Sequence, residues 1–324
     1  MFNLKSSSAR WAALLIVALV LPVSAAPVAT VLPAGSRALQ FQMLPLLRSR
    51  QDHLLVRATI NGKPALLCVD TGTPFSAIAI NRVAYFGLTQ IRPGSDLPMR
   101  LRVNDSFNAL TIARSLQLGS LNLIDEPMVA LDLEGSSRAA KEMGEEAIDG
   151  VLGADILFPT QAVLDCRAQT LILKLDPSVR GTAPGLDFTG YSRVPMRVSA
   201  GRNLYVDGKF NGRPAKLMVD TGSSGTLLHQ PFVRRMKIPL YQSGVISAFV
   251  NMRESGVQFA TIARFSVGSV NLRSKRVGVV DLGGLVTGGL LGSSPPVAGL
   301  LGAEILRRHN GIIDFGTKTL YLKQ

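Results

Sequence analysis

The sequence predicts an all-β protein built from two similar lobes that are related by a pseudo-twofold axis. The first observation is an internal repeat, in which residues 54–72 resemble residues 204–222 position by position. The second is an Asn-Gly pair between two apolar segments in each copy, a strong hairpin signal. The third is the scarcity of helix-length amphipathic patterns. Two copies are too few for a solenoid, so we expect them to face each other like the subunits of a fused dimer.

The repeat extends over most of the chain. Asp70 and Asp220 occupy equivalent positions, 150 residues apart. After a one-residue deletion the spacing is 149, and residues 149–157 match residues 298–306. A stretch rich in Pro, Gly, Ser and Thr separates the copies and reads as a linker. We therefore divide the chain into an N-terminal segment (26–40), a first lobe (41–175), a linker (176–190) and a second lobe (191–324).

Each lobe is expected to have strands on both sides of its Asn-Gly turn. These strands cover 54–60 and 65–69 in the first lobe, and 204–210 and 215–219 in the second. Short helices are expected at 154–158, 303–308, 81–86 and 230–236.

The first 25 residues have the pattern of a secretory signal peptide. Lys5 and Arg10 precede an apolar run, residues 11–21, that ends in small residues. The run is too short to span a bilayer, and cleavage is expected near Ala25. The sequence thus predicts an exported protein, periplasmic or secreted, without stable membrane insertion after signal cleavage.

Composition excludes several other classes. With 47% apolar residues the chain can build proper cores, and two cysteines cannot form a disulfide scaffold or a Cys-rich zinc site. The formal net charge is +13, but the cations are dispersed and aromatic residues make up only 6%. We therefore expect a solvated basic surface and no nucleic-acid partner. The uncharged stretch 282–303 contains many glycines and a Pro-Pro pair, so it is expected to be a loop rather than a membrane helix.

Asp-Thr-Gly follows an apolar strand in both copies, as 70–72 and 220–222. One such tripeptide is an ordinary turn signal. Two at equivalent positions would bring Asp70 and Asp220 face to face, and two carboxylates that share a site cannot easily both ionise. The ionised member can take a proton from water while the protonated member donates to a carbonyl oxygen. The sequence therefore predicts a carboxylate pair that performs acid and base catalysis.

Residues next to each aspartate are expected to support it. The glycines allow a tight turn, the hydroxyl residue after each glycine is placed to hydrogen-bond the outer carboxylate oxygen, and the middle threonines are placed to brace the two loops against each other. These supporting residues are Thr71, Gly72 and Thr73 in the first loop and Thr221, Gly222 and Ser223 in the second.

These motifs resemble the aspartic proteases, both the retropepsin type with two identical chains and the pepsin type with one. Each copy also has the family's second element, two apolar residues and a glycine, at 151–153 and 300–302, and its lobe-closing strand at 164–166 and 313–315. The resemblance implies two retropepsin-like (acid protease) β-barrel lobes in a fused bacterial aspartic endopeptidase, a hydrolase. It implies that a water activated between Asp70 and Asp220 attacks the peptide bond of a peptide or protein substrate. It also implies no cofactor, no metal and a monomer.

The sequence departs from the family at the flaps that close over the substrate. Neither the glycine-rich flap tip of retropepsins nor the flap tyrosine of pepsins is present. Flap-like hairpins are expected near 100–109 and 247–259, with Phe107 or Phe249 as aromatic contributors. Segments 134–148 and 283–297 occupy one equivalent place, which in the family borders the cleft; they are either determinants of specificity or tolerated insertions.

Two alternatives compete with an active protease. One is a peptide-binding relic that keeps the fold and lacks the chemistry. The other is an actin- or sugar-kinase-like nucleotide binder, which also has two Asp-containing loops in duplicated halves. Export, the lack of long helices and the paired apolar-apolar-Gly elements argue against the nucleotide binder.

The cysteines and histidines carry no catalytic signal of their own. Cys68 and Cys166 are interpreted either as a disulfide of an oxidising compartment or as two packed thiols. His53, His229 and His309 lie at unmatched repeat positions, which favours exposed or structural histidines over ligands.

Overall fold

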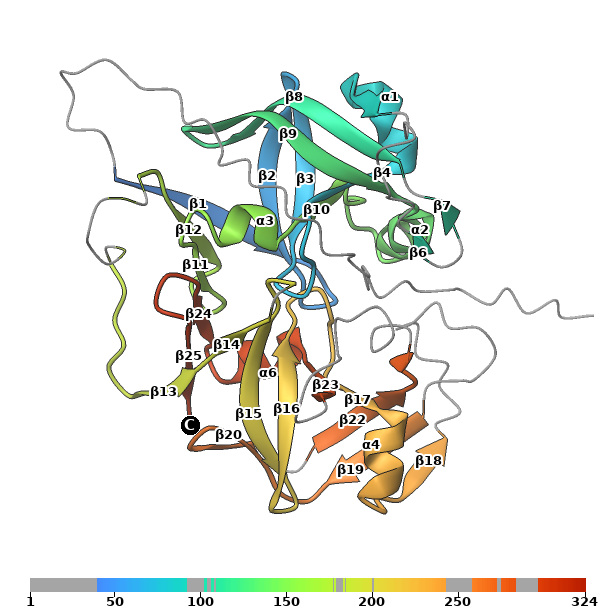
Figure 1. The fold of residues 1–324 in the computed structure, drawn as a ribbon, viewed down its shortest axis with the longest axis vertical. Coiled ribbons are helices and arrows are strands. Elements are labelled where there is room, and N and C mark those ends of the chain that lie inside the picture. Colours follow the sequence, from blue (N-terminus) through green and yellow to red (C-terminus); the bar gives the residue numbers. More distant parts are fainter. Residues whose placement is uncertain are drawn as a thin grey trace, which may run out of the picture.

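In this computed structural model, the chain forms two β-rich lobes joined by strands that cross between them (Figure 1). The structure describes residues 40–91, 109–176, 185–199, 201–242, 258–272, 275–283 and 297–324, together with 102–103, 106–107, 178 and 183. The prediction of an all-β pair of lobes is confirmed.

Strands of the first lobe surround the first Asn-Gly hairpin, with short helices at the edges. The strands are β1 (Phe41–Arg48), β2 (Leu54–Ile60), β3 (Lys63–Val69), β4 (Ala77–Ala79), β5 (Thr89–Ile91), β6 (Arg102–Val103), β7 (Ser106–Phe107), β8 (Leu110–Leu118), β9 (Leu121–Leu131), β10 (Gly150–Leu152), β11 (Val163–Asp165) and β12 (Thr170–Lys174). The helices are η1 (Ile80–Arg82), α1 (Val83–Phe86), α2 (Glu134–Glu142) and α3 (Ala154–Leu157).

The second lobe repeats this order. Its strands are β13 (Tyr191–Pro195), β14 (Arg197–Val198), β15 (Leu204–Phe210), β16 (Arg213–Val219), β17 (Leu227–His229), β18 (Leu240–Gln242), β19 (Gln258–Ile262), β20 (Phe265–Val267), β21 (Val270–Leu272), β22 (Lys275–Val280), β23 (Val297–Leu301), β24 (Ile312–Asp314) and β25 (Thr319–Lys323). Its helices are α4 (Gln230–Arg235) and α6 (Ala303–Arg308).

The Asn-Gly hairpins form as the sequence predicts. Asn61 and Gly62 have φ of 48° and 79°, and Asn211 and Gly212 have φ of 50° and 85°. Two consecutive positive φ values define the type I′ turn, which matches the twist of the flanking strands and which Asn-Gly adopts at low cost. The turns fix the register of β2 with β3 and of β15 with β16, so the two aspartates follow equivalent strand ends.

A parallel strand from later in each repeat supports each hairpin. β10 pairs with β3, and β23 pairs with β16. These are the apolar-apolar-Gly elements of the sequence, and both are completely buried. They lead into α3 and α6, so the short helices expected at 154–158 and 303–308 form at those places.

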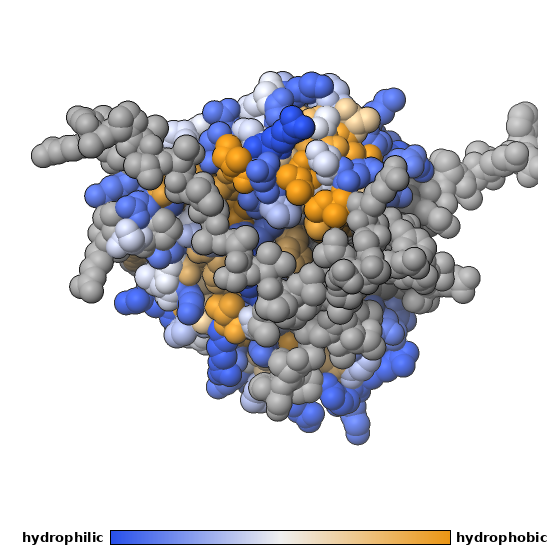
Figure 2. Space-filling view, turned by 45° about the horizontal axis from the view of Figure 1, so that its top comes forward, coloured by the Kyte–Doolittle hydropathy of each residue, from blue (hydrophilic) through white to orange (hydrophobic). Residues whose placement is uncertain are grey.

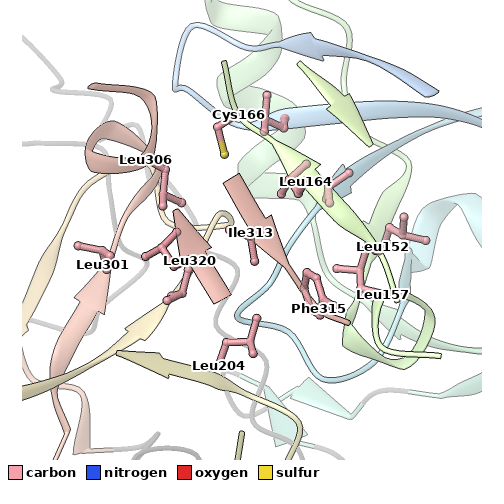
Figure 3. Packing of buried hydrophobic residues seen from close by; sticks show 14 of the residues in the cluster. Leu152, Leu157, Leu164, Cys166, Leu204, Leu301, Leu306, Ile313, Phe315 and Leu320 are labelled. Atoms are coloured by element: carbon pink, nitrogen blue, oxygen red, sulfur yellow. The ribbon is translucent and has the colours of Figure 1, made fainter. Parts of the chain in front are cut away.

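The lobes share one sheet and one core. β13, β25, β24, β11, β12 and β1 lie side by side, and β11 of the first lobe pairs with β24 of the second across the pseudo-twofold axis. Leu164 and Ile313 are opposite each other in this pairing, and Phe315 and Leu204 pack around them (Figure 3). The apolar core is therefore continuous from one lobe to the other.

On the face shown in Figure 2, the hydrophobic residues of the described part of the chain gather in patches between hydrophilic ones. Within the described part of the chain, no helix combines the length and apolar character needed to cross a membrane. The longest of these helices, α2, has nine residues, which does not fit the long helices of an actin-like nucleotide binder.

Candidate active site

The two aspartates lie at the centre of the molecule, directly after β3 and β16. Asp70 is completely buried and Asp220 is 3% exposed. The Asp70 N–H donates to the Leu152 carbonyl at 3.0 Å, and the Asp220 N–H donates to the Leu301 carbonyl at 3.0 Å. The ends of β10 and β23 thus hold the two loops in equivalent positions.

The glycines show how close the two loops come. A Cβ atom added to Gly72 would lie 2.6 Å from Cγ of Asp220, and one added to Gly222 would overlap the carboxyl group of Asp70. Each carboxyl group therefore lies against the glycine of the opposite loop. Only glycine leaves space for this approach.

The middle threonines tie the loops together across the axis. The Thr71 hydroxyl donates to the Val219 carbonyl at 2.8 Å, and the Thr221 hydroxyl donates to the Val69 carbonyl at 2.7 Å. Each hydroxyl also accepts the backbone N–H of the other threonine, at 3.0 and 3.2 Å. Since all these groups are buried, the brace satisfies backbone groups that have no access to water.

The hydrogen bonds to the two carboxyl groups differ. Asp70 accepts the Gly72 N–H on Oδ1 at 2.8 Å and the Thr73 hydroxyl on Oδ2 at 2.7 Å. Asp220 accepts two backbone donors on Oδ1, from Gly222 at 2.9 Å and from Ser223 at 3.1 Å.

The Ser223 hydroxyl does not make the contact that the sequence suggests. It donates to the Gly225 carbonyl at 2.8 Å, whereas the Thr73 hydroxyl bonds its aspartate. The β-methyl group of threonine restricts the side-chain torsion, and serine has no such restriction. Ser223 therefore supports Asp220 through its backbone N–H.

Burial raises the pKa of both aspartates. For Asp70, hydrogen bonds from Thr73 and Gly72 oppose the effect of burial. For Asp220 the pKa rises well above its ordinary value, because the charge of Asp70 adds to the effect of burial. Two carboxyl groups coupled in this way titrate as a pair and hold one proton between them over a wide pH range.

A cavity of about 230 Å³ lies next to the aspartate loops: its lining includes Cys68 and Gly222 and neither aspartate. Its apolar part includes Leu66, Cys68 and Met143, and His53 belongs to its polar wall. Helix α2 contributes Ser136 and Ala140. The sequence analysis predicts no helix for 134–148, whereas the structure forms helix α2 there and places it at the cavity.

Both cysteines are free, buried thiols, so the structure has no Cys68–Cys166 disulfide. Burial and the neighbouring aspartates raise the pKa of Cys68 well above its ordinary value, and burial raises the pKa of Cys166 to about 12. Protonated thiols are poor nucleophiles, so neither cysteine competes with the aspartates as the reactive group.

Two of the histidines have structural partners. His229 accepts the Leu282 N–H on Nδ1 at 3.0 Å, and His309 Nδ1 lies 2.6 Å from the Lys323 carbonyl oxygen. His53 is different, because it lines the cavity beside the aspartates. Its place at the cavity was not predicted, since no motif surrounds it.

Some predicted features lie outside the described residues. These are the signal peptide at 1–25, most of 283–297, Phe249 and the side chain of Phe107. In the first flap segment, β6 and β7 pair as a short antiparallel hairpin.

A family model described as "Aspartyl protease" matches residues 56–156 and again 206–304, together more than half of the chain. Among solved structures, the chain is similar to the aspartic proteinase from Irpex lacteus, with 14% identity, a TM-score of 0.45, and coverage of 88% of this chain and 97% of that chain. No curated protein sequence matches. The duplicated match places one family unit on each lobe, and the chain belongs to the aspartyl protease family.

Proposed function

We propose that this protein is an exported aspartic endopeptidase in which Asp70 and Asp220 activate a water molecule. The observation that carries the proposal is the burial of two carboxyl groups against each other's loops, with different donors on each. A buried carboxyl pair with raised pKa values supplies an acid and a base from identical residues.

In the proposed reaction, ionised Asp70 takes a proton from the water while protonated Asp220 donates its proton to the oxygen of the scissile carbonyl. The water oxygen bonds to the carbonyl carbon and forms a tetrahedral diol. When the diol collapses, one of its hydroxyl groups returns a proton to Asp220, the C–N bond breaks, and the leaving nitrogen takes up the proton held by Asp70. The hydroxyl of Thr73 stabilises the charged state of Asp70, which supports this division of roles.

The proposed substrate is a peptide or protein. A cavity next to the pair has space for one side chain, so it fits a chain that passes the aspartates. Because one chain supplies both aspartates, a monomer is sufficient for the reaction. The proposed export rests on the signal-like pattern of residues 1–25. Cell fractionation and N-terminal sequencing test it; a chain with an intact N-terminus inside the cell would contradict export.

The decisive experiment compares the purified protein with its Asp70→Asn and Asp220→Asn variants on a diverse peptide pool from acid to neutral pH. We expect cleavage by the wild type, favoured in acid, and at least about a thousandfold loss in either variant, because each removes one half of the acid–base pair. Cleavage that both variants retain would eliminate the carboxyl pair as the catalyst. Peptide binding without cleavage by the wild type would identify a relic of the fold.

A further inference from the structure

The net charge of the chain is divided unequally between the two lobes. The second lobe, residues 191–324, has 18 lysines and arginines against 6 aspartates and glutamates, a net charge of +12. The first lobe, residues 41–175, has 13 against 14 and is nearly neutral. Because both lobes form the same fold from one sequence repeat, the fold itself does not require this difference. A basic excess confined to one of two equivalent lobes indicates a negatively charged partner for that lobe.

Six of these cations gather at the end of the second lobe that lies away from the aspartates. The turn between β15 and β16 forms the centre of this end, at the bottom of Figure 1. The Asn211 N–H donates to the Arg264 carbonyl at 2.7 Å, and Nη1 of Arg213 lies 4.0 Å from Sδ of Met236, the residue after α4. The turn, the end of α4 and the segment before β20 are therefore neighbours. Their exposed cations, which we call the basic pole, are Lys209, Arg213, Arg234, Arg235, Lys237 and Arg264.

Acidic side chains do not neutralise the basic pole in the part of the chain that the structure describes. Asp207, the nearest acid along β15, forms an ion pair with Arg197 at 2.5 Å. Asp220 is buried at the active site. The remaining described acids of this lobe lie on other elements: Asp281 beside His229, Glu304 on α6 and Asp314 on β24. Six like charges without a compensating acid create a positive potential that attracts anions.

The first lobe has a different surface at the equivalent end. With the repeat spacing of 150, Lys209 and Lys237 correspond to Thr59 and Gly87. The backbone supports this spacing, because Gly87 and Lys237 both have positive φ, of 61° and 52°. Glycine adopts this conformation freely, whereas a residue with a Cβ atom is strained in it. The second lobe thus has a lysine where the backbone favours glycine, so the side chain at this position is not explained by local conformation.

The helix dipole explains only part of the basic pole. Arg234 and Arg235 lie in the last turn of α4, where cations stabilise the carbonyl end of a helix. Lys209 and Arg213 lie on β15 and β16, and strands have only small net dipoles. Stabilisation of α4 therefore does not account for the pole as a whole.

The aromatic residues at this end of the lobe face inward. Phe210 stacks on Phe265 with ring centroids 4.3 Å apart, and Phe232 packs edge-on against Phe210 at 5.7 Å. All three side chains are buried. Proteins that bind single-stranded nucleic acids stack the bases on aromatic side chains, and the pole provides charge without such rings. Cations that project from a turn and a helix end fit a broad anionic surface, such as that formed by lipid headgroups.

We propose that the basic pole binds the surface of an anionic phospholipid membrane. Because β16 has seven residues at about 3.3 Å each, roughly 20 Å separate the β15–β16 turn from Asp220. The membrane and a peptide substrate therefore bind at different places on the molecule. Of the proposed function, this inference uses only export, which brings the chain to a membrane surface, and it does not depend on peptide cleavage.

The test measures binding to phospholipid vesicles by cosedimentation. The protein is prepared as the chain that begins at Ala26, so the apolar run 11–21 cannot insert into the vesicles. One set of vesicles contains phosphatidylcholine alone and the other contains phosphatidylglycerol as well. We expect binding to the anionic vesicles only, and we expect it to weaken from about 0.1 M to 0.5 M salt, because salt screens exposed charges.

The pole variant replaces three cations by the residues that the first lobe has at the same positions. It carries Lys209→Thr, Arg234→Ala and Lys237→Gly, all at exposed sites. A cation near an anionic membrane contributes about fivefold to binding, so the loss of three should weaken binding about a hundredfold. Circular dichroism and thermal unfolding establish that the variant is folded.

The control variant has the same net charge and an intact pole. It carries Lys63→Gln, Arg114→Gln and Lys141→Gln, which remove three exposed cations from the first lobe. We expect its binding to weaken less than about threefold, because these side chains lie on the other lobe. Cleavage of a soluble peptide should be unchanged in both variants, since none of the six residues belongs to the aspartate loops.

Two results would overturn the proposal. Equal losses in the pole and control variants would show that total charge, and not the pole, causes binding. A wild type that ignores anionic vesicles at about 0.1 M salt would exclude the membrane, and retention of that protein on heparin or single-stranded DNA would assign the pole to a soluble polyanion instead. A wild type that binds the vesicles and cleaves no peptide would contradict the proposed function alone.

Discussion

The two Asp-Thr-Gly loops have the same backbone and different hydrogen bonds. Both aspartates follow equivalent strands and both are braced by equivalent threonines. Yet Asp70 receives a side-chain hydroxyl, and Asp220 receives two backbone N–H groups. The comparison teaches that a duplicated framework places the carboxyl groups symmetrically, while a single difference such as Thr73 against Ser223 gives them different hydrogen bonds. We expect Asp220 to hold the shared proton and Asp70 to carry the negative charge.

Among the residues that support the aspartates, the largest effect is expected at the two glycines, and it should be similar in the two loops. In Gly72→Ala and Gly222→Ala the new methyl group would collide with the opposite carboxyl group, so we expect kcat/KM to fall at least about a hundredfold in each. Gly225→Ala is the control, because a Cβ there meets nothing within 4 Å. Peptide cleavage with matched circular dichroism spectra checks the result. Near-normal activity in either loop variant would contradict the close approach of the loops.

Loss of the Thr71 or of the Thr221 hydroxyl, which brace the two loops, should destabilise the protein by similar amounts. Thr71→Val and Thr221→Val each remove a buried donor and leave a buried carbonyl unpaired, together with an N–H of the opposite loop. Each variant should lose about 1–3 kcal/mol in the free energy of unfolding, and the double variant less than the sum of the two. Urea unfolding measures these values. Strictly additive losses would mean that the two hydroxyls do not form one network.

Substitutions of Thr73 and Ser223, the residues after the two glycines, should have different effects on activity. Thr73→Val removes the hydroxyl donor to Asp70, which raises the pKa of Asp70 and moves the acid limb of the pH–rate profile to higher pH. Activity on the acid side should fall about tenfold, the equivalent of about one pKa unit. Ser223→Ala should leave this limb in place, because its hydroxyl bonds Gly225. Equal shifts in the two variants would remove the assignment of different charge states.

The smallest effect concerns stability and is expected in the first lobe. Burial raises the pKa of Glu126 to about 7 and that of Asp155 to about 6, and the charge of Asp155 contributes to the shift of Glu126. Both values exceed those of an unfolded chain, about 4, so the folded state binds more protons between about pH 4 and 7. Stability should therefore fall as the pH rises through this window.

Glu126→Gln tests this dependence. Removal of one of the two acids should flatten the fall of Tm between about pH 4 and 7. By the repeat spacing of 149, the second lobe has Lys275 at the equivalent position, so Lys275→Gln is the control and should leave the slope unchanged. A slope that does not respond to Glu126→Gln would show that other groups cause it.

Much of the fold was predictable because the sequence contains an internal repeat, so each structural signal occurs twice. The strands at 54–60 and 204–210 form with those bounds, since alternating apolar residues and an Asn-Gly turn specify a hairpin locally. The facing positions of Asp70 and Asp220 followed from the same duplication. Each copy of the sequence repeat forms an equivalent lobe, and the two lobes face each other about the pseudo-twofold axis.

Other features had no local signal. Helix α2 was not predicted, because its sequence resembles that of an ordinary charged loop. The helix buries only Ala139, and surface contacts such as the Glu134–Arg138 ion pair support it. His53 and Gly222 come from different lobes and line one cavity, and no spacing along the chain indicates this. The orientation of the Ser223 hydroxyl depends on a choice between two nearby acceptors. Such contacts are decided by tertiary packing.

The strand pairing between the lobes has a consequence for synthesis. β11 pairs with β12 of its own lobe and with β24 of the second lobe, and β24 in turn pairs with β25. An emerging chain that has already made both aspartates still lacks the sheet that holds their lobes together. Residues 312–323 thus complete the sheet that joins the two lobes, and this pairing forms only after these residues have been synthesised.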